Sequence, residues 1–216
     1  MAFFIPEDEC NFPPVDLADS DGLLAIGGSL SFDRLINAYT NGIFPWYNEG
    51  EPACWYSPDP RFVLFPSHIK TSQSMKVVLR KKQFRFSINQ DFKGVIKGCA
   101  RVKRNGEPGT WISKEIEDAY INLFEKGLAH SAEAWNCNEL VGGLYGVKMG
   151  NVFFGESMFA SQNNASKFAF INYVKYLETQ GVELVDCQVY TPHLESLGAE
   201  LISRKNFNNL LKRLIG

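Results

Sequence analysis

The sequence predicts an α+β fold in which a small loop-rich domain at residues 1–60 precedes a larger domain at residues 61–216. The first 60 residues are rich in Pro, Gly and Trp and carry one clear helical pattern. Beyond them strand and helix patterns alternate, and the central strands are close enough in sequence to form hairpins. Helices that cross over a mainly antiparallel sheet indicate the α+β class. A chain of 216 residues, 45% apolar and 21% charged, is long enough for such a pair of domains.

The N-terminal helix is bounded by Ser31, which can cap its first turn, and by Gly42, which can end it. Its buried stripe consists of apolar residues at helical spacing: Leu35, Ile36, Ala38 and Tyr39. Pro58 and Pro60 flank Asp59 and disfavour helix, so we place the domain border in this stretch.

The larger domain has its own series of expected elements. The strands are expected at 62–65, 84–88, 131–136, 140–147, 152–159 and 183–190. The helices are expected from Ser72 or Ser74 onward, at 92–100, from Ser113 to Gly127, at 165–179 and at 206–214. The strands at 140–147 and 152–159 form a hairpin around 148–151. A hairpin followed by a helix and a strand also suits an acetyltransferase-like (GNAT) arrangement.

Several classes of protein are disfavoured by what the sequence lacks. The N-terminus has no basic region followed by an apolar run, and no segment is apolar enough to span a bilayer, so we expect a cytoplasmic protein without a membrane partner. Five cysteines without a CxxC pair predict reduced thiols. The three histidines form no metal-binding pattern, and Ser157 lacks the GxSxG pattern of serine hydrolases. We therefore expect no metal and no cofactor.

Positive charge is concentrated in one segment, although the net charge of the chain is −2. Residues 66–104 contain eleven of the 22 basic residues and one acid, Asp91, which gives the segment a formal charge of +10. A one-sided basic patch can bind phosphate whatever the total charge. A solvated basic face without a partner would have the same composition, and the segment alone leaves both interpretations open.

The strand around Asp186 and Gln188 places two polar side chains in an apolar run. Because side chains alternate between the faces of a strand, these two are expected on one face, about 7 Å apart, with Val185, Cys187 and Val189 on the other. A buried carboxylate and a buried amide need hydrogen-bonding partners. The pair is therefore either a buried structural feature or part of a polar cleft, and the strand alone does not decide between them.

Glu156 raises the same question, because it lies inside the apolar stretch FFGESMF. Gly155 precedes it and lets another chain or a ligand approach the backbone closely. Alternation groups Glu156 with Phe154 and Met158, so its carboxylate could hold an amino group while these neighbours hold an apolar side chain. A structural ion pair is the alternative.

The turn before the helix at 165–179 is ASQNN and contains no glycine. A coenzyme A-dependent acetyltransferase usually needs a glycine-rich turn at that point, because backbone N–H groups there grip the pyrophosphate. The fold can be retained, but the coenzyme site is expected to be missing.

Eight short motifs follow one another along the chain: GLLAIGG at 22–28, GIFPW at 42–46, WYSPDPR at 55–61, GTWI at 109–112, LVGGLYG at 140–146, FGESMF at 154–159, NASK at 164–167 and DCQ at 186–188. Together they resemble the bacterial leucyl/phenylalanyl-tRNA–protein transferases over nearly the whole chain. Any one motif is a weak signal, whereas eight in the right order are specific.

The resemblance implies transfer of Leu, Phe or Met from a charged tRNA to a protein whose N-terminal residue is Arg or Lys, which marks that protein for degradation. It also implies a small N-terminal domain, a GNAT-like catalytic domain, and a cleft between them for the aminoacyl end and terminal adenosine of the tRNA. Because the donor is an ester and the product an amide, no ATP is expected. Residues 66–104 are expected to contact the acceptor stem.

The resemblance also assigns roles to single residues. Asp186 and Gln188 are expected to serve the acceptor amine, with Asp186 supplying negative charge and Gln188 orienting the amine, while Glu156 helps to hold the aminoacyl end. The pocket for the donor side chain is expected to consist of Leu144, Phe153, Met158, Phe170, Tyr173 and Val185. The terminal adenosine is expected to stack on or bond to Trp46, Trp111 and Tyr120.

Two rival functions are weighed against this one. The first is a coenzyme A-dependent acyltransferase on the same fold, against which the missing glycine-rich turn argues. The second is a noncatalytic tRNA- or peptide-binding module, which would bind its partner without forming a product.

Overall fold

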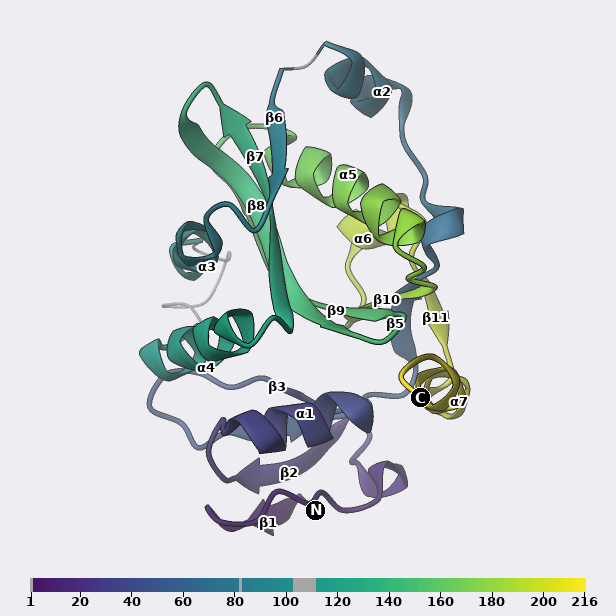
Figure 1. The fold of residues 1–216 in the computed structure, drawn as a ribbon. Coiled ribbons are helices and arrows are strands. Elements are labelled where there is room, and N and C mark those ends of the chain that lie inside the picture. Colours follow the sequence, from purple (N-terminus) through teal and green to yellow (C-terminus); the bar gives the residue numbers. More distant parts are fainter. Residues whose placement is uncertain (1, 82, 103–111) are drawn as a thin grey trace.

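The computed structural model describes residues 2–81, 83–102 and 112–216, and Figure 1 shows their arrangement. The N-terminal part contains a four-stranded sheet in the order β1-β2-β4-β3. Its strands are β1 at Phe3–Ile5, β2 at Leu23–Gly27, β3 at Phe44–Pro45 and β4 at Cys54–Tyr56. Helix α1, at Phe32–Thr40, lies beside this sheet (Figure 1).

The rest of the chain is built around a seven-stranded sheet in the order β11-β5-β10-β9-β8-β7-β6. The strands are β5 at Arg61–Leu64, β6 at Arg85–Ile88, β7 at Ala129–Asn136, β8 at Glu139–Met149, β9 at Val152–Ala160, β10 at Leu184–Gln188 and β11 at Glu200–Ile202. Every pairing is antiparallel except that of β9 with β10, which is parallel. This sheet confirms the predicted α+β class.

Helices cover both faces of the large sheet (Figure 1). Helices α3 (Phe92–Ala100) and α4 (Lys114–Glu125) pack on one face, and α5 (Ala165–Thr179) packs on the other. Each face has its own apolar cluster, and the cluster under α3 and α4 continues into the N-terminal sheet through residues such as Leu24 and Trp55. The remaining helices are α2 at Gln73–Arg80, α6 at Pro192–Ser196 and α7 at Arg204–Leu214, with short 3₁₀ helices at Val15–Leu17 and Pro66–His68.

Local signals account for the helices that the sequence predicts. The Ser31, Ser72 and Ser113 hydroxyls accept hydrogen bonds from backbone N–H groups three residues further on, so all three cap α-helices. Helix α5 spans the expected residues 165–179, and the hairpin of β8 and β9 is also confirmed.

The loop-rich interpretation of residues 1–60 was incomplete, because it missed the four-stranded sheet. Its strands have two to five residues, too few to show an alternating pattern. Two of them also contain residues that weaken a strand prediction, Pro45 in β3 and Gly27, with φ of 98°, in β2.

Candidate active site

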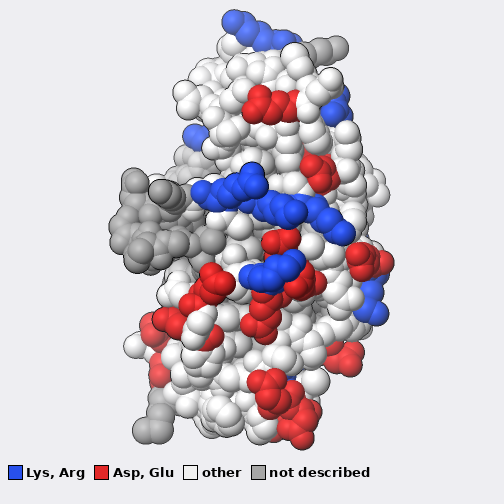
Figure 2. Space-filling model, turned by 90° about the vertical axis from the view of Figure 1, so that its left-hand side faces the viewer, with Lys and Arg blue, Asp and Glu red and all other residues white. Residues whose placement is uncertain are grey.

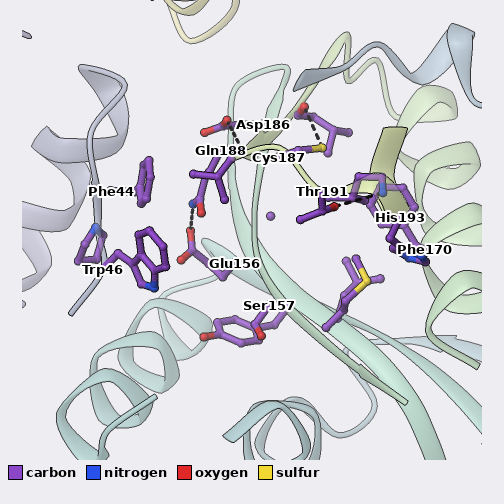
Figure 3. A pocket seen from close by; sticks show the side chains of 18 residues that line it. Phe44, Trp46, Glu156, Ser157, Phe170, Asp186, Cys187, Gln188, Thr191 and His193 are labelled. Carbon is purple, nitrogen blue, oxygen red and sulfur yellow. Dashed lines mark hydrogen bonds between the residues drawn. The ribbon is translucent and has the colours of Figure 1, made fainter. Parts of the chain in front are cut away.

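A pocket of about 420 Å³ opens where β9 and β10 separate (Figure 3). The two strands are paired only from Val152 to Phe154 on β9 and from Leu184 to Asp186 on β10. Beyond this point β9 continues without a partner on that side, and the wall is completed by β3 and by the segment around α6. The lining residues are Phe44, Pro45, Trp46, Leu144, Tyr145, Gly155, Glu156, Ser157, Met158, Phe170, Val185, Asp186, Cys187, Gln188, Val189, Thr191, His193 and Leu194.

Asp186 is held by Arg61 in a buried, two-point ion pair. Arg61 Nε lies 2.8 Å from Asp186 Oδ1, and Arg61 Nη2 lies 2.7 Å from Oδ2. Both residues are at most 1% exposed. The guanidinium also stacks between two rings, with its carbon 4.7 Å from the centre of Phe44 and 4.6 Å from that of Phe207. The charge of Asp186 is therefore compensated inside the protein.

The end of β10 is irregular at Gln188. The register of β10 against β5 shifts between Asp186 and Gln188, and Gln188 adopts φ of 65°. Its backbone N–H donates to Asp186 Oδ1 over 2.9 Å, and its side-chain Nε2 donates to Glu156 Oε1 over 2.9 Å. The two side chains still face one apolar cluster, as expected, while Val185 and Cys187 pack in the other. Within that shared face they have different partners, since the Asp186 carboxylate meets Arg61 whereas the Gln188 amide meets Glu156.

Glu156 faces the pocket as an extra residue in β9. The register shift opposite it pairs Tyr145 with Ser157 and Gly146 with Gly155, so Glu156 has no partner in the ladder. Its Oε1 accepts a hydrogen bond from Tyr39 over 2.8 Å, and its Oε2 accepts one from Tyr120 over 2.9 Å. Among the described residues no salt bridge reaches this carboxylate.

The environment of Glu156 shifts its protonation equilibrium toward the neutral form, compared with an exposed carboxyl. Burial raises the pKa of this carboxyl to about 7, and the charge of Asp186 adds to the rise, while the three hydrogen bonds oppose it. The pKa of both Tyr39 and Tyr120 is raised well above its ordinary value by burial and by the charge of Glu156, so both phenols keep their protons.

The six apolar residues predicted for the donor pocket fall into two groups, one that lines the pocket and one that lies behind the lining. Leu144, Met158, Phe170 and Val185 line the pocket. Phe153 and Tyr173 lie behind this wall and are buried against each other, with ring centres 5.0 Å apart. They support the wall rather than form its surface.

The three aromatic residues predicted for the adenosine have different positions. Trp46 is 43% exposed at the pocket wall, beside Tyr56. Tyr120 is fully buried, and its hydroxyl bonds Tyr39 and Glu156, so its ring presents no open face. Trp111 lies outside the described residues.

Sequence reasoning missed three residues of this site. Tyr39 was assigned only to the apolar stripe of its helix, and Arg61 only to the end of the motif WYSPDPR. His193 lines the pocket, and its Nε2 is buried without a hydrogen-bonding partner. Burial, with a contribution from Lys167, lowers the pKa of this imidazole. Arg61 ends a motif, whereas Tyr39 and His193 lie outside all eight motifs, so no direct sequence signal pointed to these two.

Neither a metal-binding cluster nor a membrane-spanning helix is found within residues 2–81, 83–102 and 112–216. Within these ranges no three His, Cys, Asp or Glu side chains gather as a metal ion would need. None of the helices there combines the length and the apolar character required to cross a bilayer.

Comparison with known proteins identifies the family. Residues 63–212 match the family model of leucyl/phenylalanyl-tRNA protein transferases, and residues 28–59 match the model of the N-terminal domain of the same family. The chain belongs to the leucyl/phenylalanyl-tRNA protein transferase family. It is therefore an aminoacyltransferase, as the eight motifs predicted.

Two similar relatives extend this likeness over nearly the whole chain. The leucyl/phenylalanyl-tRNA–protein transferase of Christiangramia forsetii is 53% identical over 98% of this chain and 100% of its own length. That of Pseudomonas fluorescens is 49% identical over 99% of this chain and 95% of its own. Among solved structures, the crystal structure of FemX aligns with a TM-score of 0.51 and 11% identity, over 83% of this chain and 70% of FemX, so the two proteins share a fold.

Proposed function

We propose that this protein transfers Leu, Phe or Met from a charged tRNA to the α-amine of proteins that begin with Arg or Lys, which marks them for degradation. The observation that carries the proposal is the composition of the pocket between β9 and β10. One part of its wall is apolar and suits the side chain of the donor, and another part presents the carboxylate of Glu156 and the amide of Gln188.

The chemistry needs little from the protein beyond positioning and proton handling. The aminoacyl ester is more reactive than the amide product, so transfer runs downhill without ATP. The acceptor amine must be neutral to attack, and its reference pKa is about 7.7–8.0. A weak base near this value is sufficient.

The donor end is proposed to bind with its side chain against Leu144, Met158, Phe170 and Val185 and with its terminal adenosine on Trp46. An exposed indole at the wall supports that assignment, because stacking of a base on an aromatic ring contributes about 1–3 kcal/mol. Phe153 and Tyr173 stabilise the apolar wall from behind.

The acceptor amine is proposed to approach Gln188 and Glu156. Asp186 acts there by accepting a hydrogen bond from the backbone N–H of Gln188, which fixes that backbone. Arg61 balances the charge of Asp186. The amide of Gln188 orients groups in the pocket, since a neutral amide is a very poor base.

The tRNA is proposed to lie along the basic segment at 66–104. Lys93, Lys97 and Arg101 are exposed and four residues apart on and just after α3, so they share one face of that helix. Figure 2 shows basic side chains in a band across the side of the molecule where α3 and α4 lie, with acidic side chains below them. Lys82, Lys103 and Arg104 fall outside the described residues.

We further propose a division into an N-terminal domain at residues 1–60 and a GNAT-like catalytic domain at residues 61–216. The separate sheets and the two matching family models support this division. A substrate set of charged tRNA and protein N-termini is consistent with action in the cytoplasm.

A label-transfer assay tests the proposal. The purified chain is mixed with tRNA carrying radiolabelled Phe and with a peptide that begins with Arg, and label in the peptide is counted. We expect transfer from Phe-, Leu- and Met-tRNA and none from labelled acetyl-coenzyme A. Binding of the tRNA without labelled peptide would contradict the proposal and favour a noncatalytic module.

A further inference from the structure

Four oxygen atoms and the carboxyl carbon of Glu156 close a ring of hydrogen-bonding contacts beside the pocket. Tyr39 Oη lies 2.8 Å from Glu156 Oε1, and Tyr120 Oη lies 2.9 Å from Glu156 Oε2. The two phenol oxygens lie 2.5 Å from each other. The ring therefore contains three oxygen–oxygen contacts, each short enough for a hydrogen bond.

The number of protons in this ring depends on the state of Glu156. Each phenol supplies one proton, so an ionised carboxylate leaves two protons for three contacts. A protonated carboxyl supplies the third: Tyr39 donates to Oε1, Oε2 donates to Tyr120, and Tyr120 donates to Tyr39. One additional proton, carried by the Glu156 carboxyl at the wall of the pocket, therefore completes the three hydrogen bonds of the ring.

The other carboxylate of the site is not suited to take that proton. Both oxygens of Asp186 are bonded to Arg61, and Oδ1 also accepts the backbone N–H of Gln188. Protonation of Asp186 would leave a buried guanidinium without its counter-charge, which is strongly unfavourable. Glu156 has no such cation among the described residues.

We propose that Glu156 takes the proton from the acceptor's α-ammonium, and that Tyr39 and Tyr120 are positioning residues that close a hydrogen-bonded ring around it. This inference rests on the proposed function. It differs from the sequence-based expectation, in which Asp186 supplied the charge and Glu156 held the donor.

The step balances in atoms and charge. One N–H bond of the ammonium breaks, its proton goes to Glu156, and its electron pair stays on the nitrogen. That pair attacks the ester carbonyl carbon and forms the C–N bond. As the C–O bond to the ribose breaks, a second N–H proton passes to the leaving ribose oxygen. Protonated Glu156 then returns its proton to water.

The charged and titratable groups around Glu156 come from five elements. The pKa of about 7 that burial gives this carboxyl fits a group that exchanges a proton near neutrality. The groups that face it or its direct partners are Tyr39 of α1, Tyr120 of α4, Tyr145 of β8, Asp186 of β10 and Arg61 of β5. Of these, Tyr39 comes from the N-terminal part, which thereby completes the site.

Glu156→Gln gives a direct test, because a carboxamide has the shape of a protonated carboxyl and can fill the same ring. The amide oxygen accepts from Tyr39 and the amide nitrogen donates to Tyr120, so we expect an unchanged thermal melt. Single-turnover transfer from Phe-tRNA to a peptide beginning with Arg should fall by about 100-fold or more at pH 7. The loss should shrink at pH 8.5, where the free amine is already neutral.

Tyr39→Phe and Tyr120→Phe test the positioning role through the pH profile. Each removes a hydrogen bond that stabilises the carboxylate, so the pKa of Glu156 rises. The limb of the rate–pH profile along which the rate increases with pH then moves to higher pH. The matched controls are Tyr47→Phe, which breaks the Tyr47–Glu115 hydrogen bond, and Glu133→Gln, which removes another buried carboxylate. Neither control should move the limb.

The outcomes separate the two proposals. No product from the wild-type chain would overturn the proposed function itself. Product from the wild type together with a wild-type rate for Glu156→Gln would overturn the proton-transfer role. A loss that is the same at every pH, or a profile unmoved in both tyrosine variants, would overturn it as well.

Discussion

At the scale of residues, two carboxylates in the neighbouring strands β9 and β10 differ in whether a cation compensates their charge, because their partners differ. Asp186 meets a guanidinium in a two-point ion pair, whereas Glu156 meets two phenols and an amide. The first charge is compensated, and burial raises the pKa of the second carboxyl to about 7. A polar residue in an apolar strand therefore cannot be assigned a role until its partners are known.

Asp186→Asn should destabilise the fold. It leaves Arg61 buried between Phe44 and Phe207 without a counter-charge, and breaking one side of a buried pair costs about 3–5 kcal/mol. Urea unfolding followed by circular dichroism measures the change. The control is Glu183→Gln, which removes the exposed pair with Arg213 and should cost less than about 1 kcal/mol. Equal effects of the two variants would contradict the structural role given to Asp186.

At the scale of elements, the sequence predicted those whose signals are local. Helix α5 and the hairpin of β8 and β9 follow from apolar spacing and turn residues. The bulge at Gln188, the Arg61–Asp186 pair and the contact of Tyr39 with Glu156 could not be predicted in this way. The two contacts join residues that are 125 and 117 positions apart, and the bulge interrupts the regular pairing of β10 with β5.

The sequence therefore predicted which motifs belong to the site better than how they meet. It placed Glu156, Asp186, Gln188 and the apolar wall in one cleft through the resemblance, and the pocket lining includes these residues except Phe153 and Tyr173, which lie behind it. Alternation grouped Asp186 with Gln188 on one face, but it could not identify their separate partners, Arg61 and Glu156.

Gly142→Ala tests how closely α5 packs on the sheet. A methyl group at this position of β8 would meet Ala165 Cβ at 2.6 Å and the Ala165 carbonyl carbon at 2.9 Å, at the first residue of α5. Such overpacking costs about 1–3 kcal/mol, which thermal or urea unfolding would detect. Gly155→Ala is the control for stability, since its methyl would meet its nearest atom, the Asp186 carbonyl oxygen, at 3.4 Å. An unchanged unfolding free energy in Gly142→Ala would refute the packing described.

At the scale of the whole molecule, the site is assembled from both parts of the chain. The N-terminal part supplies Phe44 and Trp46 to the pocket and Tyr39 to Glu156, and a shared apolar cluster joins it to the large sheet. The basic band of Figure 2 lies on the side formed by α3 and α4. This arrangement allows one face to bind the tRNA while the pocket receives its aminoacyl end.

The charge distribution predicts that tRNA binding weakens steeply with salt. Each phosphate contact contributes about −0.7 to −0.9 to the slope of log K against log salt concentration. Replacing both Lys97 and Arg101 by Glu should make the slope shallower by about 0.7–0.9 for each lost contact, measured by filter binding. Lys175→Glu on the exposed side of α5 is the control and should leave the slope unchanged. A flat salt response of the wild type would remove the basis for this assignment.

The most direct test of the central claim is to identify the product. The chain is incubated with Phe-tRNA and a peptide that begins with Arg and contains an internal Lys, and the peptide is sequenced by tandem mass spectrometry. The account predicts one added Phe on the α-amine of the Arg, and no addition when that amine is acetylated. Phe on the Lys side chain, or on the acetylated peptide, would contradict it.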